Sequence, residues 1–189
     1  MRNDHASLQR RPFLMPLWLT LVAVAAAFGL MIFAVWVWGT ADTTTVIVVR
    51  HAEKDLGSVV DPPLNEAGEA RAELLARMFG DAHAPGHIDA IYTSSALRSR
   101  LTAAPLAARL GLAASVPQAD DPERLARRAL REHGGGRVLI VGHLDTIPKI
   151  VAALSGSDKI PPIDERDYST MYIVTVPRIG HANLLRLKY

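Results

Sequence analysis

The feature that most constrains this fold is a short β-branched run that ends abruptly in a cation and an imidazole. Val46 to Val49 reads Val-Ile-Val-Val, and Arg50 and His51 follow it directly. The run is too short to cross a membrane, and its Val and Ile residues favour strand over helix, so it predicts a strand buried on both faces. Open α/β sheets bind their ligands just beyond the carboxyl ends of such strands. The run therefore predicts an α/β fold with Arg50 and His51 at its ligand-binding edge.

The rest of the chain after residue 44 alternates between strand-like and helical patterns. Predicted strands cover residues 45–49, 88–93, 112–116, 137–142, 169–176 and 182–188. Predicted helices cover residues 66–79, 96–110, 122–133 and 146–154. Alternation of this kind predicts a three-layer α/β/α sandwich with a mainly parallel central sheet. The last two strands, joined by a short turn, predict an antiparallel hairpin at the edge of that sheet.

Two other predicted strands deliver polar side chains to the same edge. The strand 88–93 leads into a helix with Arg98 in its first turn, and the strand 137–142 is followed by His143. We expect these two residues to lie beside Arg50 and His51, because the carboxyl ends of parallel strands meet at one edge. Arginine forks bind phosphate oxygens bidentately, and a neutral imidazole is available as a nucleophile near pH 7. The arrangement indicates phosphoryl transfer.

In their order and spacing, these motifs resemble those of the histidine phosphatase superfamily, the phosphoglycerate-mutase-like proteins, in a small branch without a large cap insertion. The resemblance rests on Arg50-His51-Ala52, on the stretch from Ser95 to Ala103, on Val141-Gly142-His143 and on the loop from Asp61 to Gly68. It runs from about residue 44 to the end of the chain.

The resemblance implies a role for each residue of the site. His51 would be the nucleophile that forms a phosphohistidine, which water then hydrolyses, with no metal and no cofactor. Arg50, Arg98 and His143 would bind the phosphoryl group together with His51 and stabilise its charge. Arg98 could instead be an ordinary exposed charge on the helix, and Arg100, two residues further on, is the competing candidate. Arg98 is preferred because it lies four residues before Thr102, as in the family pattern.

The proton donor for the leaving group is left open by the sequence. Some family members carry an acid directly after the second histidine, where this chain has Leu144. Asp121 is the candidate catalytic acid, with Asp120 and Asp145 as alternatives. The Asp-Pro-Glu sequence that begins at Asp121 is also typical of a helix N-cap. Small members that act on phosphohistidine need no acid, because their leaving group is already good.

The N-terminal region predicts a membrane helix. Residues 13–38 form an apolar run without charge that is long enough to cross a bilayer. Arg2, Arg10 and Arg11 precede the run, while only Asp42 is charged between it and Val49. The excess of arginine on the amino side places that side in the cytoplasm and the rest of the chain outside it.

The expected organisation therefore has four parts: a cytoplasmic tail (1–12), a transmembrane signal anchor (13–38), a linker (39–44) and a catalytic domain (45–189). A signal peptide cleaved near Ala41 is the alternative, and it would lead to a secreted domain. The anchor is favoured, because the apolar run is longer than the roughly 7–15 residues usual in signal peptides.

Composition limits the partners. The formal net charge is only +2, which gives nucleic-acid binding no electrostatic support. The chain has no cysteine, and neither an HExxH motif nor acidic residues at metal-ligand spacing occur in it, so no metal site is predicted. The expected partners are a phosphorylated small molecule or phosphoprotein as substrate, and the lipid bilayer.

The expected function is a phosphatase that hydrolyses a phosphomonoester or a phosphoramidate such as phosphohistidine. One alternative is a phosphoglycerate-mutase-type phosphotransferase. It is disfavoured because retaining the phosphoenzyme needs covering segments that this minimal domain lacks. The other alternative is a non-catalytic module that binds phosphorylated ligands, and such a module would not need the nucleophile.

Overall fold

The computed structural model describes residues 14–39, 43–57, 60–81, 86–117 and 121–189. The chain divides into two compact units, Met1–Ala41 and Asp42–Tyr189. The first unit contains α1 (Leu14–Gly39), and the second contains every other helix and strand of the described residues.

Helix α1 is apolar on all sides. Its segment Leu17–Trp36 has a mean hydropathy of 2.4, and none of it is buried within the protein. Large side chains such as Trp18 and Phe28 are about 60% exposed. A helix that is hydrophobic all round is typical of a segment surrounded by hydrocarbon. By length and composition α1 can cross a membrane, and a signal sequence near the N-terminus would share both properties.

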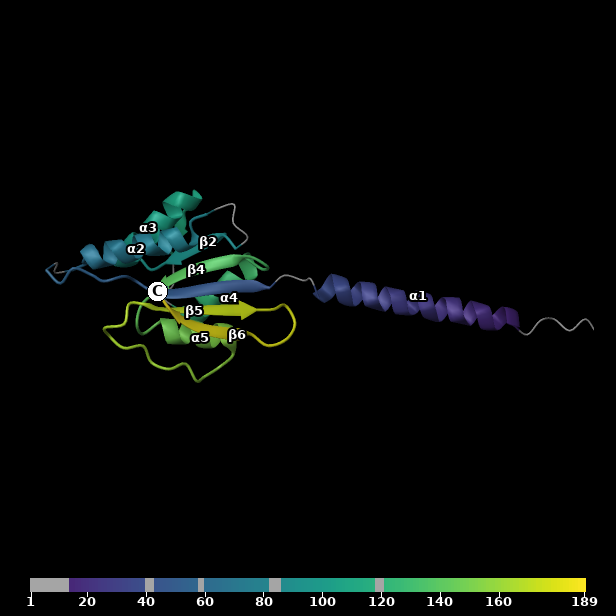
Figure 1. Ribbon diagram of the computed structural model, residues 1–189. Coiled ribbons are helices and arrows are strands. Elements are labelled where there is room, and N and C mark those ends of the chain that lie inside the picture. Colours follow the sequence, from purple (N-terminus) through teal and green to yellow (C-terminus); the bar gives the residue numbers. More distant parts are fainter. Residues whose placement is uncertain (1–13, 40–42, 58–59, 82–85, 118–120) are drawn as a thin grey trace, which may run out of the picture. The chain divides into compact units, whose positions relative to one another are not determined.

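The second unit is built on a six-stranded sheet with the order β3-β2-β4-β1-β5-β6. The strands are β1 (Thr44–Arg50), β2 (Ala90–Thr93), β3 (Ala114–Ser115), β4 (Arg137–Gly142), β5 (Thr170–Val176) and β6 (Asn183–Lys188). The first four strands in this order are parallel, whereas β5 pairs antiparallel with β1 and β6 antiparallel with β5. Figure 1 shows the sequence of strands from β2 to β6.

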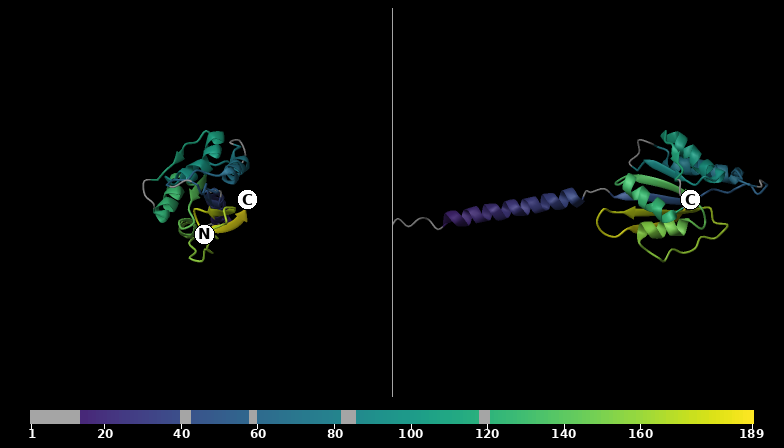
Figure 2. Two further views of the ribbon diagram at one scale, coloured as in Figure 1. Left: turned by 90° about the vertical axis from the view of Figure 1, so that its left-hand side faces the viewer. Right: turned by 180° about the vertical axis from the view of Figure 1, so that it is seen from behind.

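Four helices cover the sheet: α2 (Glu66–Phe79), α3 (Leu97–Leu110), α4 (Pro122–Glu132) and α5 (Ile147–Ser155). Helices α2 and α3 pack on one face and α4 and α5 on the other. Figure 2 shows the second pair in front of the sheet when the molecule is seen from behind. The predicted three-layer sandwich with a mainly parallel sheet is confirmed, and each helix and strand begins and ends within two residues of its predicted bounds.

Burial explains why β1 reads as a continuous apolar run. Val46 and Val48 face the α4–α5 layer, whereas Ile47 and Val49 face the α2–α3 layer. All four side chains are at most 3% exposed, because both faces of the strand are covered. An alternating apolar and polar pattern would have been expected only with one face in water.

The connections of β1 and β4 create a crevice at one edge of the sheet. These strands are neighbours, but the chain leaves β1 toward α2 on one face and leaves β4 toward α5 on the other. Open α/β sheets bind ligands where neighbouring connections diverge in this way. His51 and His143 are the residues that follow the two strands at this point.

Candidate active site

The four residues that the sequence predicts to converge do lie at one site. The His51 and His143 rings are 5.3 Å apart, measured between centroids. The charges of Arg50 and Arg98 both act on His51. Arg50 is only 8% exposed and His51 only 5%, so the cation and the imidazole are taken out of bulk water together.

The surroundings of His51 fix both its tautomer and its charge. Its Nδ1 lies 2.8 Å from the carbonyl oxygen of Ala52. A carbonyl oxygen only accepts, so Nδ1 carries the proton and the lone pair is on Nε2. Burial above all, and the charges of Arg98 and Arg50, lower the pKa of His51 to about 4, although the Ala52 carbonyl opposes the shift. Near pH 7 the ring is therefore neutral to a greater degree than an ordinary histidine, whose pKa is near 6.5.

The backbone around His51 is tied to two neighbouring elements. The His51 amide donates to the Gly142 carbonyl at 3.0 Å, which joins the ends of β1 and β4. The Ala52 amide donates to Thr102 Oγ1 at 2.9 Å, and this hydroxyl donates to the Arg98 carbonyl at 2.7 Å. One threonine thus connects the strand that carries His51 to the helical turn that carries Arg98.

Arg50 is held by the loop before β5. Its Nη1 donates to the carbonyl oxygen of Glu165 at 2.6 Å, and the Asp167 carbonyl lies 3.4 Å away. The Tyr168 ring covers the guanidinium, with 4.1 Å from Cζ to the ring centroid. Its centroid is also 6.0 Å from that of His51. Arg50 Nε is buried and has no hydrogen-bond partner among the described residues.

The loop that holds Arg50 is itself braced by Asp167. This carboxylate accepts hydrogen bonds from the Ser169 and Thr170 amides and from both of their hydroxyls. Burial works against its charge, but those hydrogen bonds and the ammonium of Lys188, 3.5 Å away, hold the pKa of Asp167 well below its usual range. The loop is therefore pinned at the base of β5, next to the arginine that it contacts.

Arg98 faces the site, and Asp61 from the loop before α2 supports it. The Asp61 carboxylate accepts from the Leu97 amide with both oxygens at 3.0 Å and lies 3.7 Å from Arg98 Nη1. Asp61 therefore caps α3 in place of Ala96, whose side chain cannot do so. Arg98 Nε is buried without a partner in the described part of the chain, whereas Arg100 is exposed.

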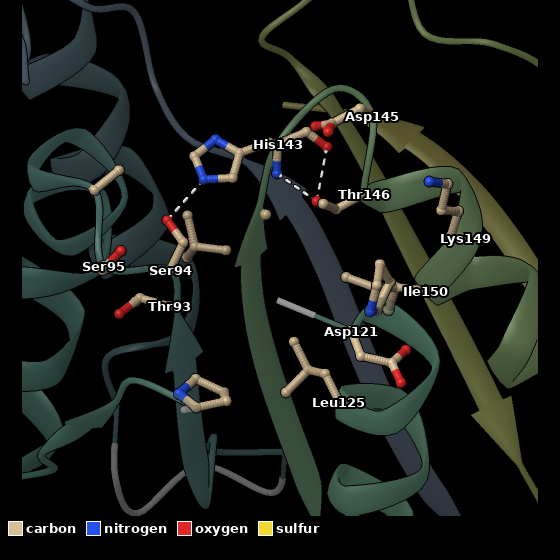
Figure 3. A pocket seen from close by; sticks show the side chains of 15 residues that line it. Thr93, Ser94, Ser95, Asp121, Leu125, His143, Asp145, Thr146, Lys149 and Ile150 are labelled. Atoms are coloured by element: carbon tan, nitrogen blue, oxygen red, sulfur yellow. Dashed lines mark hydrogen bonds between the residues drawn. The ribbon is translucent and has the colours of Figure 1, made fainter. Parts of the chain in front are cut away.

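His143 is oriented by hydroxyl groups. Its Nε2 and Ser94 Oγ are hydrogen-bonded at 2.7 Å, and Ser94 in turn donates to the fully buried Ser99 at 2.9 Å. The His143 amide donates to Thr146 Oγ1 at 2.9 Å. Figure 3 shows the hydrogen bonds of His143 with Ser94 and with Thr146, and it places His143 at the upper end of a cavity.

That cavity, of about 430 Å³, opens between the ends of β2 and β4 and the first turns of α4 and α5. Its wall includes His143, Ser94, Asp121, Asp145, Lys149, Leu125 and Ile150. Two of the three predicted acid candidates therefore line the same cavity as His143. Asp121 is also the N-cap of α4, since its Oδ1 accepts from the Glu123 and Arg124 amides. Asp120 lies outside the described residues.

Sequence reasoning did not assign roles to Asp61, Ser94 or Tyr168. Ser94 directly follows β2, and that position was a usable signal. Asp61 gave no signal for its role, because the helix that it caps lies 36 residues away in the sequence. Tyr168 gave no signal, because its contact with Arg50 joins segments more than a hundred residues apart. Within the described ranges, no group of three or more His, Asp or Glu side chains is arranged to hold a metal ion.

Comparison with known proteins gives a family match and several similar folds. A family model described as "Histidine phosphatase superfamily (branch 1)" matches residues 46–121. No curated protein sequence matches the chain.

Three solved structures illustrate the fold similarity. A tungstate complex of the protein histidine phosphatase SixA has 21% identity and a TM-score of 0.60, with 76% of this chain and 96% of that one covered. A mycobacterial glucosyl-3-phosphoglycerate phosphatase has 17% identity and a TM-score of 0.59, covering 75% and 97%. A putative alpha-ribazole-5'-P phosphatase from Escherichia coli has 16% identity and a TM-score of 0.58, covering 77% and 96%. At these identities the similarity concerns the fold.

Proposed function

We propose that the chain is a phosphatase of the histidine phosphatase superfamily that forms a phosphohistidine on His51, and the match of that family's model to residues 46–121 supports the assignment. The substrate is a phosphomonoester or a phosphoramidate, and no metal takes part in the reaction. The observation that carries the proposal is the state of His51: neutral, protonated on Nδ1, and flanked by two arginines whose buried Nε groups have no partner among the described residues.

The geometry supports a two-step reaction. His51 Nε2 donates its lone pair to phosphorus, a nitrogen–phosphorus bond forms, and the bond from phosphorus to the leaving oxygen or nitrogen breaks. Arg50 and Arg98 neutralise the non-bridging oxygens, which is the main catalytic task in phosphoryl transfer. Water then attacks the phosphohistidine, inorganic phosphate leaves, and His51 returns to its neutral form.

Two carboxylates are available to protonate an alkoxide leaving group. Asp145 lines the cavity beside His143, and its side chain has no partner within the described part of the chain. Asp121 lines the same cavity but already caps α4. Both are retained as candidate acids.

The test is to trap the intermediate with the full chain in detergent. Incubation with 32P-labelled aryl phosphate and rapid quenching should leave phosphate on the protein that is labile to acid and stable to base. A non-catalytic binding module would release no phenol and trap no phosphate. A mutase would transfer the label to an acceptor more readily than to water. Either result would contradict the proposal.

We further propose that α1 is a signal anchor, with residues 1–12 in the cytoplasm and the domain 45–189 outside it. The support is the uncharged, fully exposed apolar segment Leu17–Trp36 and the arginines on its amino side. A reporter that functions only outside the cytoplasm, fused after Tyr189, should be active. The protein should also stay with membranes after a high-salt wash. A soluble form that begins near Asp42 would indicate a cleaved signal peptide instead.

A further inference from the structure

The wall of the cavity beside His143 contains charged residues of both signs. Its wall contains one ammonium group, from Lys149, and two carboxylates, from Asp121 and Asp145. Leu125 and Ile150 add apolar surface to the same wall (Figure 3). Both signs of charge therefore surround one space of about 430 Å³, within the usual range of ligand sites.

The charged side chains of the cavity wall do not form ion pairs with one another. Asp145 and Lys149 are four residues apart, a spacing that often gives an ion pair when both residues are helical. Here Asp145 precedes α5, and the two do not pair. Neither side chain has any hydrogen bond or ion pair among the residues that the structure describes. Asp121 uses only its Oδ1 in capping α4.

From this arrangement we propose that the cavity is the subsite for the leaving group of the substrate, and that this group is a small zwitterion. The substrate class is a free O-phosphorylated hydroxy amino acid. Its carboxylate pairs with Lys149, its ammonium lies against Asp145, and its carbon atoms contact Leu125 and Ile150. The proposal rests on the proposed phosphatase function, because only then does the group next to His143 become a leaving group.

Competing leaving groups fit these walls less well. A phosphorylated side chain within a protein has amides in place of the ammonium and the carboxylate, so it would leave the charges of Lys149 and Asp145 unpaired. A leaving group with one sign of charge would leave one of them unpaired. A neutral alcohol would leave both. A zwitterion is the class of leaving group that can pair with both Lys149 and Asp145.

The experiment compares four alkyl phosphates with the full chain in detergent. O-phosphoserine bears both charges, O-phosphoethanolamine only the ammonium, phosphoglycolate only the carboxylate and ethyl phosphate neither. We expect kcat/KM to be highest for O-phosphoserine, with a gain of up to about fivefold for each charge that finds a partner, since the pairs are exposed.

Substitutions assign each gain to a residue. Lys149→Met should lower kcat/KM up to about fivefold for O-phosphoserine and phosphoglycolate and leave the ratio between the other two substrates unchanged. Asp145→Asn should lower the preference for an ammonium group. Lys159→Met, an exposed lysine outside the cavity wall, is the matched control and should change nothing.

Equal effects of Lys149→Met on all four substrates, or ethyl phosphate turnover as fast as that of O-phosphoserine, would overturn the subsite. A uniform loss in Asp145→Asn would make Asp145 the acid and overturn its role in recognition. p-Nitrophenyl phosphate distinguishes failure of the subsite from failure of the phosphatase function, because an enzyme that cannot hydrolyse this substrate is not a phosphatase. In that case calorimetry still tests the subsite: O-phosphoserine should bind up to about fivefold more weakly to Lys149→Met than to the wild type, and equal binding refutes it.

Discussion

The two sides of the crevice differ in how firmly their polar groups are held. On the side formed by β1 and α3, Arg50 and His51 are buried, and each is bound to a backbone carbonyl. On the side formed by β4 and α5, Asp145 and Lys149 are exposed, and their side chains have no partners in the described part of the chain. The first side is organised before any ligand arrives, and the second is open.

This difference matches the demands of phosphoryl transfer. The transferred group is the same in every substrate, so fixed charges around it cost no reorganisation during the reaction. The leaving group differs between substrates, and the residues that meet it set specificity. The comparison predicts that substitutions on the held side act on every substrate, whereas those on the open side depend on the leaving group.

The largest effect is expected on the held side, at His51. His51→Ala should lower kcat by a factor on the order of 10⁴ or more, since it removes the nucleophile. Circular dichroism should show an intact fold, and no acid-labile phosphate should be trapped. His87→Ala is the control, since His87 is half-buried and pairs only with Asp89 among the described residues. Full activity of His51→Ala would end the proposed mechanism.

Arg98 should come next. Arg98→Ala should lower kcat by about 10²–10³ for aryl and alkyl phosphates alike, comparable to losing one preorganised donor to a developing charge. Arg100→Ala, two residues along the same helix, should have little effect because Arg100 is exposed. Steady-state kinetics of both variants tests which arginine binds the phosphoryl group. Equal losses of kcat would contradict the assignment of that role to Arg98.

The candidate acids should give a smaller and selective effect. Replacement of the true acid should slow alkyl phosphates by about 10², while aryl phosphates, whose leaving group departs without a proton, change little. Asp121→Asn is well suited to this test, because asparagine is also a good N-cap and preserves α4. Asp145→Asn is its counterpart. If neither variant distinguishes the two substrate types, an activated phosphate such as a phosphoramidate becomes the better substrate class.

Tyr168 tests whether the held side depends on the loop before β5. Tyr168→Leu removes the ring 4.1 Å from the Arg50 guanidinium. A desolvated cation–π contact contributes up to about 2 kcal/mol, so kcat/KM should fall up to about 30-fold. If Tyr168 positions the Arg50 guanidinium for phosphate binding, KM should rise by a larger factor than kcat falls. Tyr168→Phe keeps the ring and should resemble the wild type, and an equally impaired Phe variant would point to the hydroxyl instead.

The last prediction concerns pH and acts on stability instead of turnover. In an NMR titration of the folded protein, the His51 ring should titrate near pH 4 instead of 6.5. Because the folded-state pKa lies below the unfolded value, the unfolded chain binds the extra proton first as pH falls. The free energy of unfolding should therefore decrease from about pH 6.5 down to about pH 4 and then level off. His51→Gln should lack this component, and a midpoint near 6.5 in the wild type would contradict the assigned burial.

Asp121 shows what a local sequence pattern can predict about a residue and what it cannot. The Asp-Pro-Glu pattern predicted that α4 begins at Pro122, and the structure agrees. The same pattern gave no indication that Asp121 would also line a cavity with His143, because that depends on where α4 packs relative to β4. One residue was thus predictable in its local role and unpredictable in its place at the site.

The sequence by itself determined the strands, the helices and the convergence of Arg50, His51, Arg98 and His143. These follow from periodicity and from the rule that parallel strands end at one edge, and both are local or topological properties. Only the tertiary structure decided that Tyr168 covers Arg50, that Asp61 caps α3 and that Ser94 meets His143. Each of these contacts joins a loop or a strand end to a segment distant in the sequence. Loop conformation is set by packing and by hydrogen bonds across the fold, which no short-range pattern of residues records.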